Sequence, residues 1–170
     1  ENPWIALGRK TLQTVVWRRL DDNSEREIVK DGYEVSQLMP NPLDDNAIFI
    51  LCKSPDNDGK PVKEGTANKV IAVAKLDGSI PRTVFAPKPE DKIEMDALRV
   101  TPQRNFVFAH VKGHSVVALL EDDKLVPLEN APIFGDVSHD GKTIAGIGIV
   151  KGQETLFGLV LYDIESKRTS

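Results

Sequence analysis

One motif recurs along the chain and limits what the chain can fold into. An apolar stretch ending in an aliphatic residue is followed each time by an acidic or small polar turn. The aliphatic residues are Leu20, Leu76, Leu120 and Ile164, so the spacings are 56, 44 and 44 residues. Such a period, with apolar runs separated by turn residues, indicates a chain built from similar supersecondary units.

Two further motifs follow nearly the same period. A polar turn that precedes an apolar run begins at Asn41, Thr101 and Ser138, and the last two copies lie 37 residues apart. The tripeptide Val-Lys-Gly begins at Val111 and again at Val150, 39 residues later. Its glycine can supply the positive φ that tight hairpins need. Three independent motifs therefore indicate one repeat of about 40 residues.

The segments between these motifs are short, rich in Val, Ile, Phe and Leu, and bounded by Gly, Pro, Asn and Asp, which is typical of strands joined by turns. No segment shows sustained helical periodicity. The predicted strands fall into three groups: 4–7, 14–20 and 26–29; 34–39, 47–52, 70–76 and 82–85; and 95–100, 106–111, 115–120 and 125–128.

Four strands in each repeat of this length are the unit of a β-propeller. We therefore predict an all-β fold of propeller-like blades, each of four antiparallel strands, in an incomplete ring of about three and a half blades. An open or sandwich-like all-β domain built from the same hairpins is the alternative. Residues 1–170 form a single all-β repeat region. It divides into a partial blade 1–31, a blade 32–88 with an insertion at 53–69, a blade 89–130, and a blade 131–170 that lacks its outer strand.

The last repeat carries a family resemblance. The turn Ser138-His139-Asp140-Gly141-Lys142, and the later segment Leu161-Tyr162-Asp163-Ile164, resemble the blades of TolB-like and prolyl-oligopeptidase-type (S9) propellers. His139 stands where that turn usually has proline and is expected to face solvent, and the Trp-Asp pair of WD40 blades is absent. The resemblance implies propeller architecture and favours a periplasmic or exported location, but it transfers no catalytic residue.

A closed propeller typically has 4 to 8 blades, which is more than this chain provides. Either the chain is a piece of a longer protein, or a second chain supplies the missing blades. No signal peptide is expected within these residues, because no basic segment precedes a long apolar core. No membrane span is expected either, because the apolar runs are much shorter than the ~20 residues that a spanning helix needs.

The residues predict no catalytic, metal-binding or cofactor-binding site. Neither Gly78-Ser79 nor Gly113-His114-Ser115 fits the Gly-x-Ser-x-Gly elbow of serine hydrolases, so no triad is assigned. His110 and His114 are interpreted as ordinary hairpin residues, since no third ligand completes a metal site. Cys52, the single cysteine, lies in an apolar run and is predicted to be a small buried thiol. Walker and Rossmann phosphate loops are absent.

The charge pattern and one insertion bear on partners. A net charge of −4, with lysines and acids interspersed, argues against nucleic acid, whose phosphates need a clustered basic surface. Trp4 and Trp17 are predicted to pack between blades.

The insertion at 53–69 is the largest departure from the repeat, and segments that depart from a repeat often bind partners. The residues in it that we expect to contact a partner are Asp56, Asn57, Asp58, Lys60 and Lys63.

We therefore expect a non-catalytic propeller segment that binds a protein or peptide, or acts as a scaffold. The partner could be the remainder of its own parent protein or a second copy of the chain. The alternative is the substrate-gating propeller of a prolyl-oligopeptidase-type serine peptidase whose α/β-hydrolase domain lies outside this chain. These hypotheses differ in the kind of domain that the parent gene encodes after Ser170.

Overall fold

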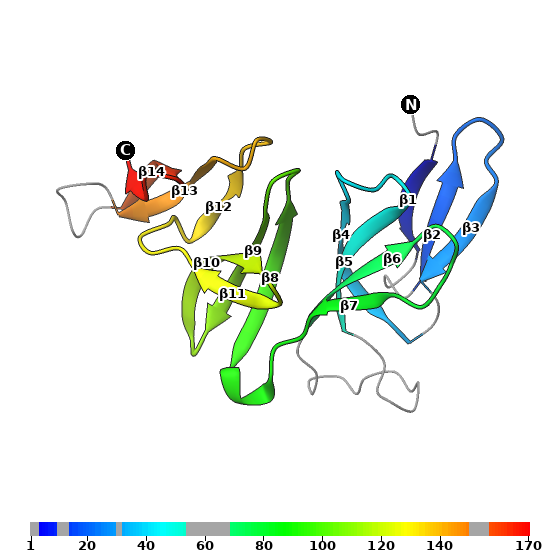
Figure 1. Ribbon diagram of the computed structural model, residues 1–170, viewed down its shortest axis with the longest axis horizontal. Coiled ribbons are helices and arrows are strands. Elements are labelled where there is room, and N and C mark those ends of the chain that lie inside the picture. Colours follow the sequence, from blue (N-terminus) through cyan, green and yellow to red (C-terminus); the bar gives the residue numbers. More distant parts are fainter. Residues whose placement is uncertain (1–3, 10–13, 30–31, 54–68, 150–156) are drawn as a thin grey trace. The chain divides into compact units, whose positions relative to one another are not determined.

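The computed structural model describes residues 4–9, 14–29, 32–53, 69–149 and 157–170. Within them, the strands form four separate sheets (Figure 1). Inside each sheet, every strand pairs antiparallel with the strand that follows it in the sequence. The first sheet contains β1 (Trp4–Arg9), β2 (Thr14–Arg19) and β3 (Glu25–Val29). The second contains β4 (Glu34–Pro40), β5 (Ala47–Lys53), β6 (Val70–Lys75) and β7 (Arg82–Phe85).

The other two sheets have four strands each. The third contains β8 (Ile93–Val100), β9 (Asn105–Val111), β10 (His114–Glu121) and β11 (Lys124–Pro127). The fourth contains β12 (Phe134–Val137), β13 (Thr143–Ile149), β14 (Phe157–Asp163) and β15 (Arg168–Thr169). The helical segment η2 (Pro89–Asp91) is a single 3₁₀ turn. None of the described helical segments has the length and apolar character needed to span a membrane.

The predicted fold class is confirmed: the chain is all-β, with propeller-like sheets of four antiparallel strands. Predicted and observed strands agree closely, as for 47–52 against Ala47–Lys53 and 115–120 against His114–Glu121. The agreement results from the turn residues, which fix where each strand ends. Gly78 and Gly113, for example, have φ values of +75° and +86°, a region that favours glycine.

The last sheet differs from the prediction, because it has an outer strand. After the turn at Lys167, whose φ is +55°, Arg168 and Thr169 pair with Asp163 and Tyr162. The backbones of Leu161 and Ser170 then exchange two hydrogen bonds of 2.9 Å. An outer strand of two residues is too short to leave an apolar run in the sequence, so reasoning from apolar runs overlooked it.

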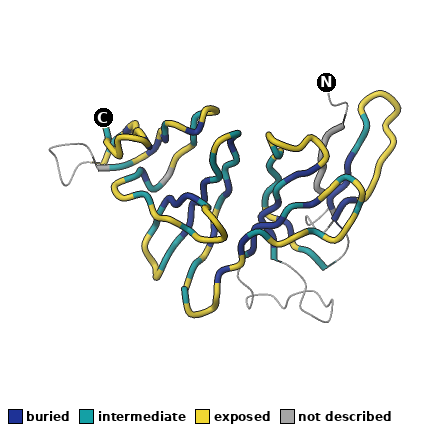
Figure 2. Tube along the Cα trace, viewed as in Figure 1, coloured by how far each residue is buried: buried dark blue, intermediate teal, exposed yellow. Residues whose placement is uncertain are grey.

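The chain separates into two compact units, Glu1–Pro87 and Lys88–Ser170. In each unit, buried side chains from two sheets form an apolar cluster. Figure 2 shows where buried residues lie along the chain trace. The first-unit core contains Val15, Trp17, Ile28, Val29, Val35, Ile48, Ile50, Cys52, Val70, Ala72 and Ala74. The second-unit core contains Phe106, Phe108, Val117, Leu119, Ile144, Tyr162 and Ile164. The prediction that Trp17 packs between neighbouring sheets agrees with its place in the first of these cores.

Candidate functional site

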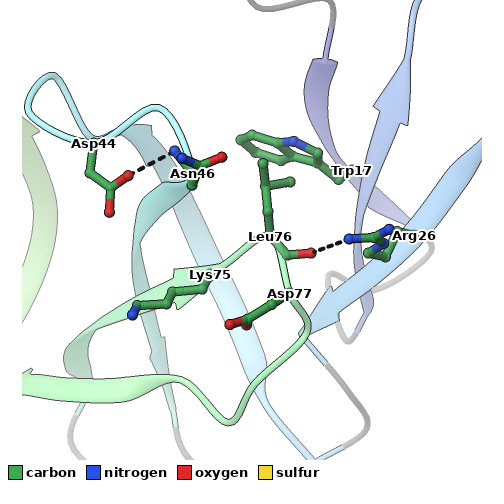
Figure 3. A pocket seen from close by; sticks show the side chains of 7 residues that line it. All are labelled: Trp17, Arg26, Asp44, Asn46, Lys75, Leu76 and Asp77. Atoms are coloured by element: carbon green, nitrogen blue, oxygen red, sulfur yellow. Dashed lines mark hydrogen bonds between the residues drawn. The ribbon is translucent and has the colours of Figure 1, made fainter.

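A hollow in the first unit is the candidate site (Figure 3). Its volume is about 520 Å³, within the ~300–1,000 Å³ range of typical ligand sites. We call it the turn hollow, because β2 and β3 line it together with the turn between β4 and β5 and the turn after β6. The lining residues are Trp17, Arg26, Asp44, Asn46, Lys75, Leu76 and Asp77.

Local hydrogen bonds fix the turn between β4 and β5. The Oδ1 atom of Asp44 accepts the backbone N–H of Asn46 at 2.9 Å, and the carbonyl oxygen of Asp44 accepts the N–H of Ala47 at 3.0 Å. Aspartate favours such turns because its side chain can bond the backbone two residues further on. The carbonyl oxygen of Asn46 in turn accepts the N–H of Leu76 at 2.9 Å. These bonds hold the two turns of the hollow together.

The turn after β6 presents a charged carboxylate. The Oδ1 atom of Asp77 accepts the backbone N–H of Ser79 at 2.8 Å. Hydrogen bonds from the side chain and the backbone of Ser79, and to a smaller extent the charges of Lys75 and Arg26, lower the pKa of Asp77 below its usual value. The charged form is therefore favoured at neutral pH.

Basic groups balance this carboxylate. Arg26 lies on β3, and its Nη1 atom donates to the carbonyl oxygen of Leu76 at 3.3 Å (Figure 3). Lys75 is exposed at the end of β6. With Asp44 and Asp77, the turn hollow offers two cationic and two carboxylate side chains, so it can pair with charged groups of either sign. Among the described residues, no group of three or more His, Cys, Asp or Glu side chains could hold a metal ion.

Trp17 forms the apolar wall of the turn hollow. Its side chain is 6% exposed and belongs to the first-unit core. The buried Nε1 atom has no hydrogen-bond partner among the described residues. The hollow therefore has one wall that is part of the folded core, while its charged rim comes from the two turns and from β3 and the end of β6.

This site was not predicted from the sequence. The residues that were expected to contact a partner, Asp56, Asn57, Asp58, Lys60 and Lys63, lie outside the described residues. The repeat motifs did predict the turn that begins at Asn41 and the turn that follows Leu76. They indicated only that these turns connect strands, and not that the two turns form a site. No local sequence pattern marks Arg26 as a site residue, because its hydrogen-bond partner Leu76 is 50 residues away in the sequence.

Three polar side chains meet on the third sheet, where no triad was assigned. The Oγ atom of Ser115 lies 2.9 Å from Nε2 of His110, whose Nδ1 lies 2.9 Å from Oδ2 of Asp96. A carboxylate can only accept, so Nδ1 carries the proton, and in the neutral ring Nε2 accepts from the Ser115 hydroxyl. Asp96 reaches His110 because the pairing of β8 and β9 shifts by one residue between Met95 and Ala97.

This network has the order of a serine–histidine–aspartate triad but lacks the setting of one. Ser115 on β10 lies directly opposite His110 on β9, inside a paired stretch of the sheet. The nucleophile of a hydrolase typically lies on a sharp turn, beside backbone N–H groups that bind the oxyanion. His110 and Asp96 are 38% and 49% exposed, so water competes for their hydrogen bonds. We interpret the network as a link across three strands.

The sequence also drew attention to Cys52, His114 and His139. Cys52 is buried, as predicted, and burial raises the pKa of its thiol to about 12. Such a thiol stays protonated and is a poor nucleophile. His114 and His139 are exposed, the first at the start of β10 and the second in the turn before β13.

Together, the separate antiparallel sheets of the described residues, three with four strands and the first with three, are typical of propeller-like blades. The sequence matches no protein-family model, and no curated protein matches it. A solved structure does match: dihydro-heme d1 dehydrogenase NirN in complex with DHE, a β-propeller-type protein, with a TM-score of 0.55 and 13% sequence identity. The match covers 99% of this chain and 34% of the NirN chain, so this chain spans about a third of that length. This likeness supports the fold alone, and nothing in it points to the TolB or S9 families in particular.

Proposed function

We propose that this chain is a non-catalytic propeller module that binds a peptide segment of a partner protein in the turn hollow. The observation that carries the proposal is the composition of the hollow. Two cationic and two carboxylate side chains surround an apolar wall formed by Trp17 and Leu76, in a volume of about 520 Å³. A peptide has the matching chemistry, because it combines backbone donors and acceptors with apolar and charged side chains.

The arrangement of the turns supports the same proposal. Loops held on a rigid scaffold are common recognition sites. Here the hydrogen bonds of Asp44 and Asp77 to their own turns keep the rim in place before a partner arrives. A rim that is already ordered loses less conformational entropy when it binds.

Selection from a random peptide library displayed on phage tests the proposal. The chain with its native Arg26 should enrich peptides that bind it, and Arg26→Glu should weaken their binding by about tenfold, which corresponds to about 1.4 kcal/mol. The substitution reverses a charge on the rim of the hollow. Affinities of the selected peptides for the purified native and variant chains should be compared by calorimetry.

Arg82→Glu is the matched control, because Arg82 is an exposed arginine of the same unit that does not line the hollow. Its peptide affinities should stay within about twofold of native, as is common for surface changes outside a contact. The proposal is wrong if no peptide is enriched, or if both arginine variants change the affinities equally.

The non-catalytic part of the proposal has its own test at Ser115. A fluorophosphonate probe forms an Oγ–phosphorus bond with an activated serine and releases fluoride. We expect no labelling of Ser115 in the folded chain by mass spectrometry, because its hydroxyl lies on a paired strand without an assembled oxyanion site. Labelling that disappears in His110→Ala would instead show that the network activates the serine, and would overturn the non-catalytic proposal.

The alternative, a gating propeller of a serine peptidase, rests on the resemblance of the last repeat. No contact among the described residues favours it over peptide binding. Sequencing of the parent gene beyond Ser170 decides between them, because the alternative requires a downstream α/β-hydrolase domain with a Gly-x-Ser-x-Gly elbow.

A further inference from the structure

The charged groups of the turn hollow differ in how far the fold already uses them. Both carboxylates are engaged in their own turns. The Oδ1 atom of Asp44 accepts the backbone N–H of Asn46 at 2.9 Å. The Oδ1 atom of Asp77 accepts the backbone N–H of Ser79 at 2.8 Å, and the side chain of Ser79 bonds the same carboxylate. The acids of the hollow therefore serve to hold its rim in place.

Arg26 is a donor that the fold leaves available. A guanidinium has five N–H groups. Within the described residues, this one makes a single hydrogen bond, from Nη1 to the carbonyl oxygen of Leu76 at 3.3 Å. No ion pair joins it to a carboxylate in that part of the chain, whereas Arg18, Arg19 and Arg99 each pair with an acid. Arg26 is also exposed, so a ligand can reach its remaining N–H groups.

This arginine lies beside the apolar wall of the hollow. Arg26 is directly opposite Trp17 in the pairing of β2 with β3. Residues that are directly opposite in an antiparallel pair lie on the same face of the sheet. Figure 3 shows both side chains next to Leu76. A ligand group that pairs with the guanidinium is therefore close to an apolar surface as well.

The repeat indicates that the fold does not need this arginine. In the first unit, the N–H of Leu76 donates to the carbonyl oxygen of Asn46 at 2.9 Å. The second unit contains the same contact between turns, from the N–H of Ile164 to the carbonyl oxygen of Lys142, also at 2.9 Å. There the aliphatic residue is 4% exposed and part of the core, and β11, which follows the third turn motif as β3 follows the first, contains no arginine. The contact forms without an arginine, which favours a role in binding for Arg26.

We propose that the turn hollow binds its peptide through one carboxylate, which pairs with Arg26, and through an adjacent apolar side chain, which packs on Trp17 and Leu76. This inference rests on the proposed function and names the group that the peptide must carry. Guanidinium and carboxylate form strong charge-assisted hydrogen bonds, often two at once. A phosphate fits less well, because its larger negative charge would be repelled more strongly by Asp44 and Asp77.

A peptide can supply this carboxylate from an Asp or Glu side chain or from a free C-terminus. Peptides should therefore be selected from two random libraries, one attached through its C-terminus and one displayed with a free C-terminus. Each enriched peptide is synthesised unchanged, with Asp and Glu replaced by Asn and Gln, and with an amidated C-terminus. Calorimetry with the native 170-residue chain should show that one of these changes weakens binding by about tenfold or more. The change that does so identifies the source of the carboxylate.

Arg26→Gln keeps an amide donor but removes the positive charge. In this variant, the same removal of the peptide carboxylate should weaken binding by less than about twofold, because the partner of the carboxylate is already gone. Arg82→Gln is the matched control, since Arg82 is an exposed arginine of the same unit that does not line the hollow. It should retain the loss of about tenfold. Circular dichroism checks that both variants fold as the native chain does.

The outcomes separate this inference from the proposed function. Peptides that bind equally well with and without their carboxylates would overturn the inference and leave peptide binding intact. An equal loss in the native and Arg26→Gln chains would overturn it too, since the carboxylate would then be bound elsewhere. A phosphoserine that replaces the acid and binds about tenfold more tightly would overturn the choice of a carboxylate. Failure to enrich any peptide from either library would instead overturn the proposed function itself, and this inference with it.

Discussion

Replacing Tyr162 with alanine should destabilise the second unit by about 3–5 kcal/mol, the usual cost of truncating a large buried aromatic side chain. Tyr162 is fully buried in the second-unit core, where residues of the third and fourth sheets meet. The loss of its ring would leave a cavity between those sheets. Hydrogen exchange of peptides from β9 and β14, measured by mass spectrometry in increasing urea, reports the change in the free energy of unfolding.

Tyr162→Phe separates the ring from the hydroxyl. The buried hydroxyl oxygen has no hydrogen-bond partner among the described residues, and burial raises its pKa. Removing an unpartnered buried polar group should leave stability within about 1 kcal/mol of native, or raise it. If Tyr162→Phe costs as much as Tyr162→Ala, the hydroxyl has a partner and this interpretation is wrong.

Replacing Trp17 with alanine should have an effect of similar size on the first unit, about 3–5 kcal/mol. The indole packs in a core that includes residues of β5 and β6 and also forms the wall of the turn hollow. The variant should therefore lose exchange protection in β5 and β6 and bind the selected peptides more weakly. The same exchange measurement and calorimetry report the two effects.

Trp17→Phe is the matched change, because it keeps an aromatic ring in the core and removes the unpartnered Nε1 atom. It should cost clearly less stability than Trp17→Ala. Peptide affinity that falls in Trp17→Ala but is native in Trp17→Phe would indicate that the wall contributes apolar surface. Equal exchange protection in native and Trp17→Ala chains would contradict the place given to Trp17 in the core.

Local sequence was enough to predict the fold. The strands of the second and third sheets were located because their turns contain Gly, Pro, Asn and Asp at a regular period. The prediction 82–85 matches Arg82–Phe85, and 34–39 matches Glu34–Pro40 within one residue. The two-residue strand β15 was overlooked because it pairs through its backbone and needs no apolar pattern.

The candidate site was much harder to predict, because its contacts are made between distant segments. Arg26 meets Leu76 only after the first two sheets have packed. The meeting of Ser115 and His110 could have been inferred from the hairpin register, since they are paired residues. The approach of Asp96 could not, because it depends on a shift in the pairing of β8 and β9 that no residue pattern signals.

The pairing of each strand with its neighbour in sequence also bears on how the chain reaches its native state. In every described sheet, hydrogen bonds join consecutive strands, so contact order within a sheet is low. Short loop closures cost little entropy, which favours rapid formation of each sheet. The exception is the hairpin of β5 and β6, whose strands are separated by residues 54–69. During synthesis on the ribosome, each sheet can therefore form soon after its last strand emerges, with the second sheet waiting longest for its partner strand.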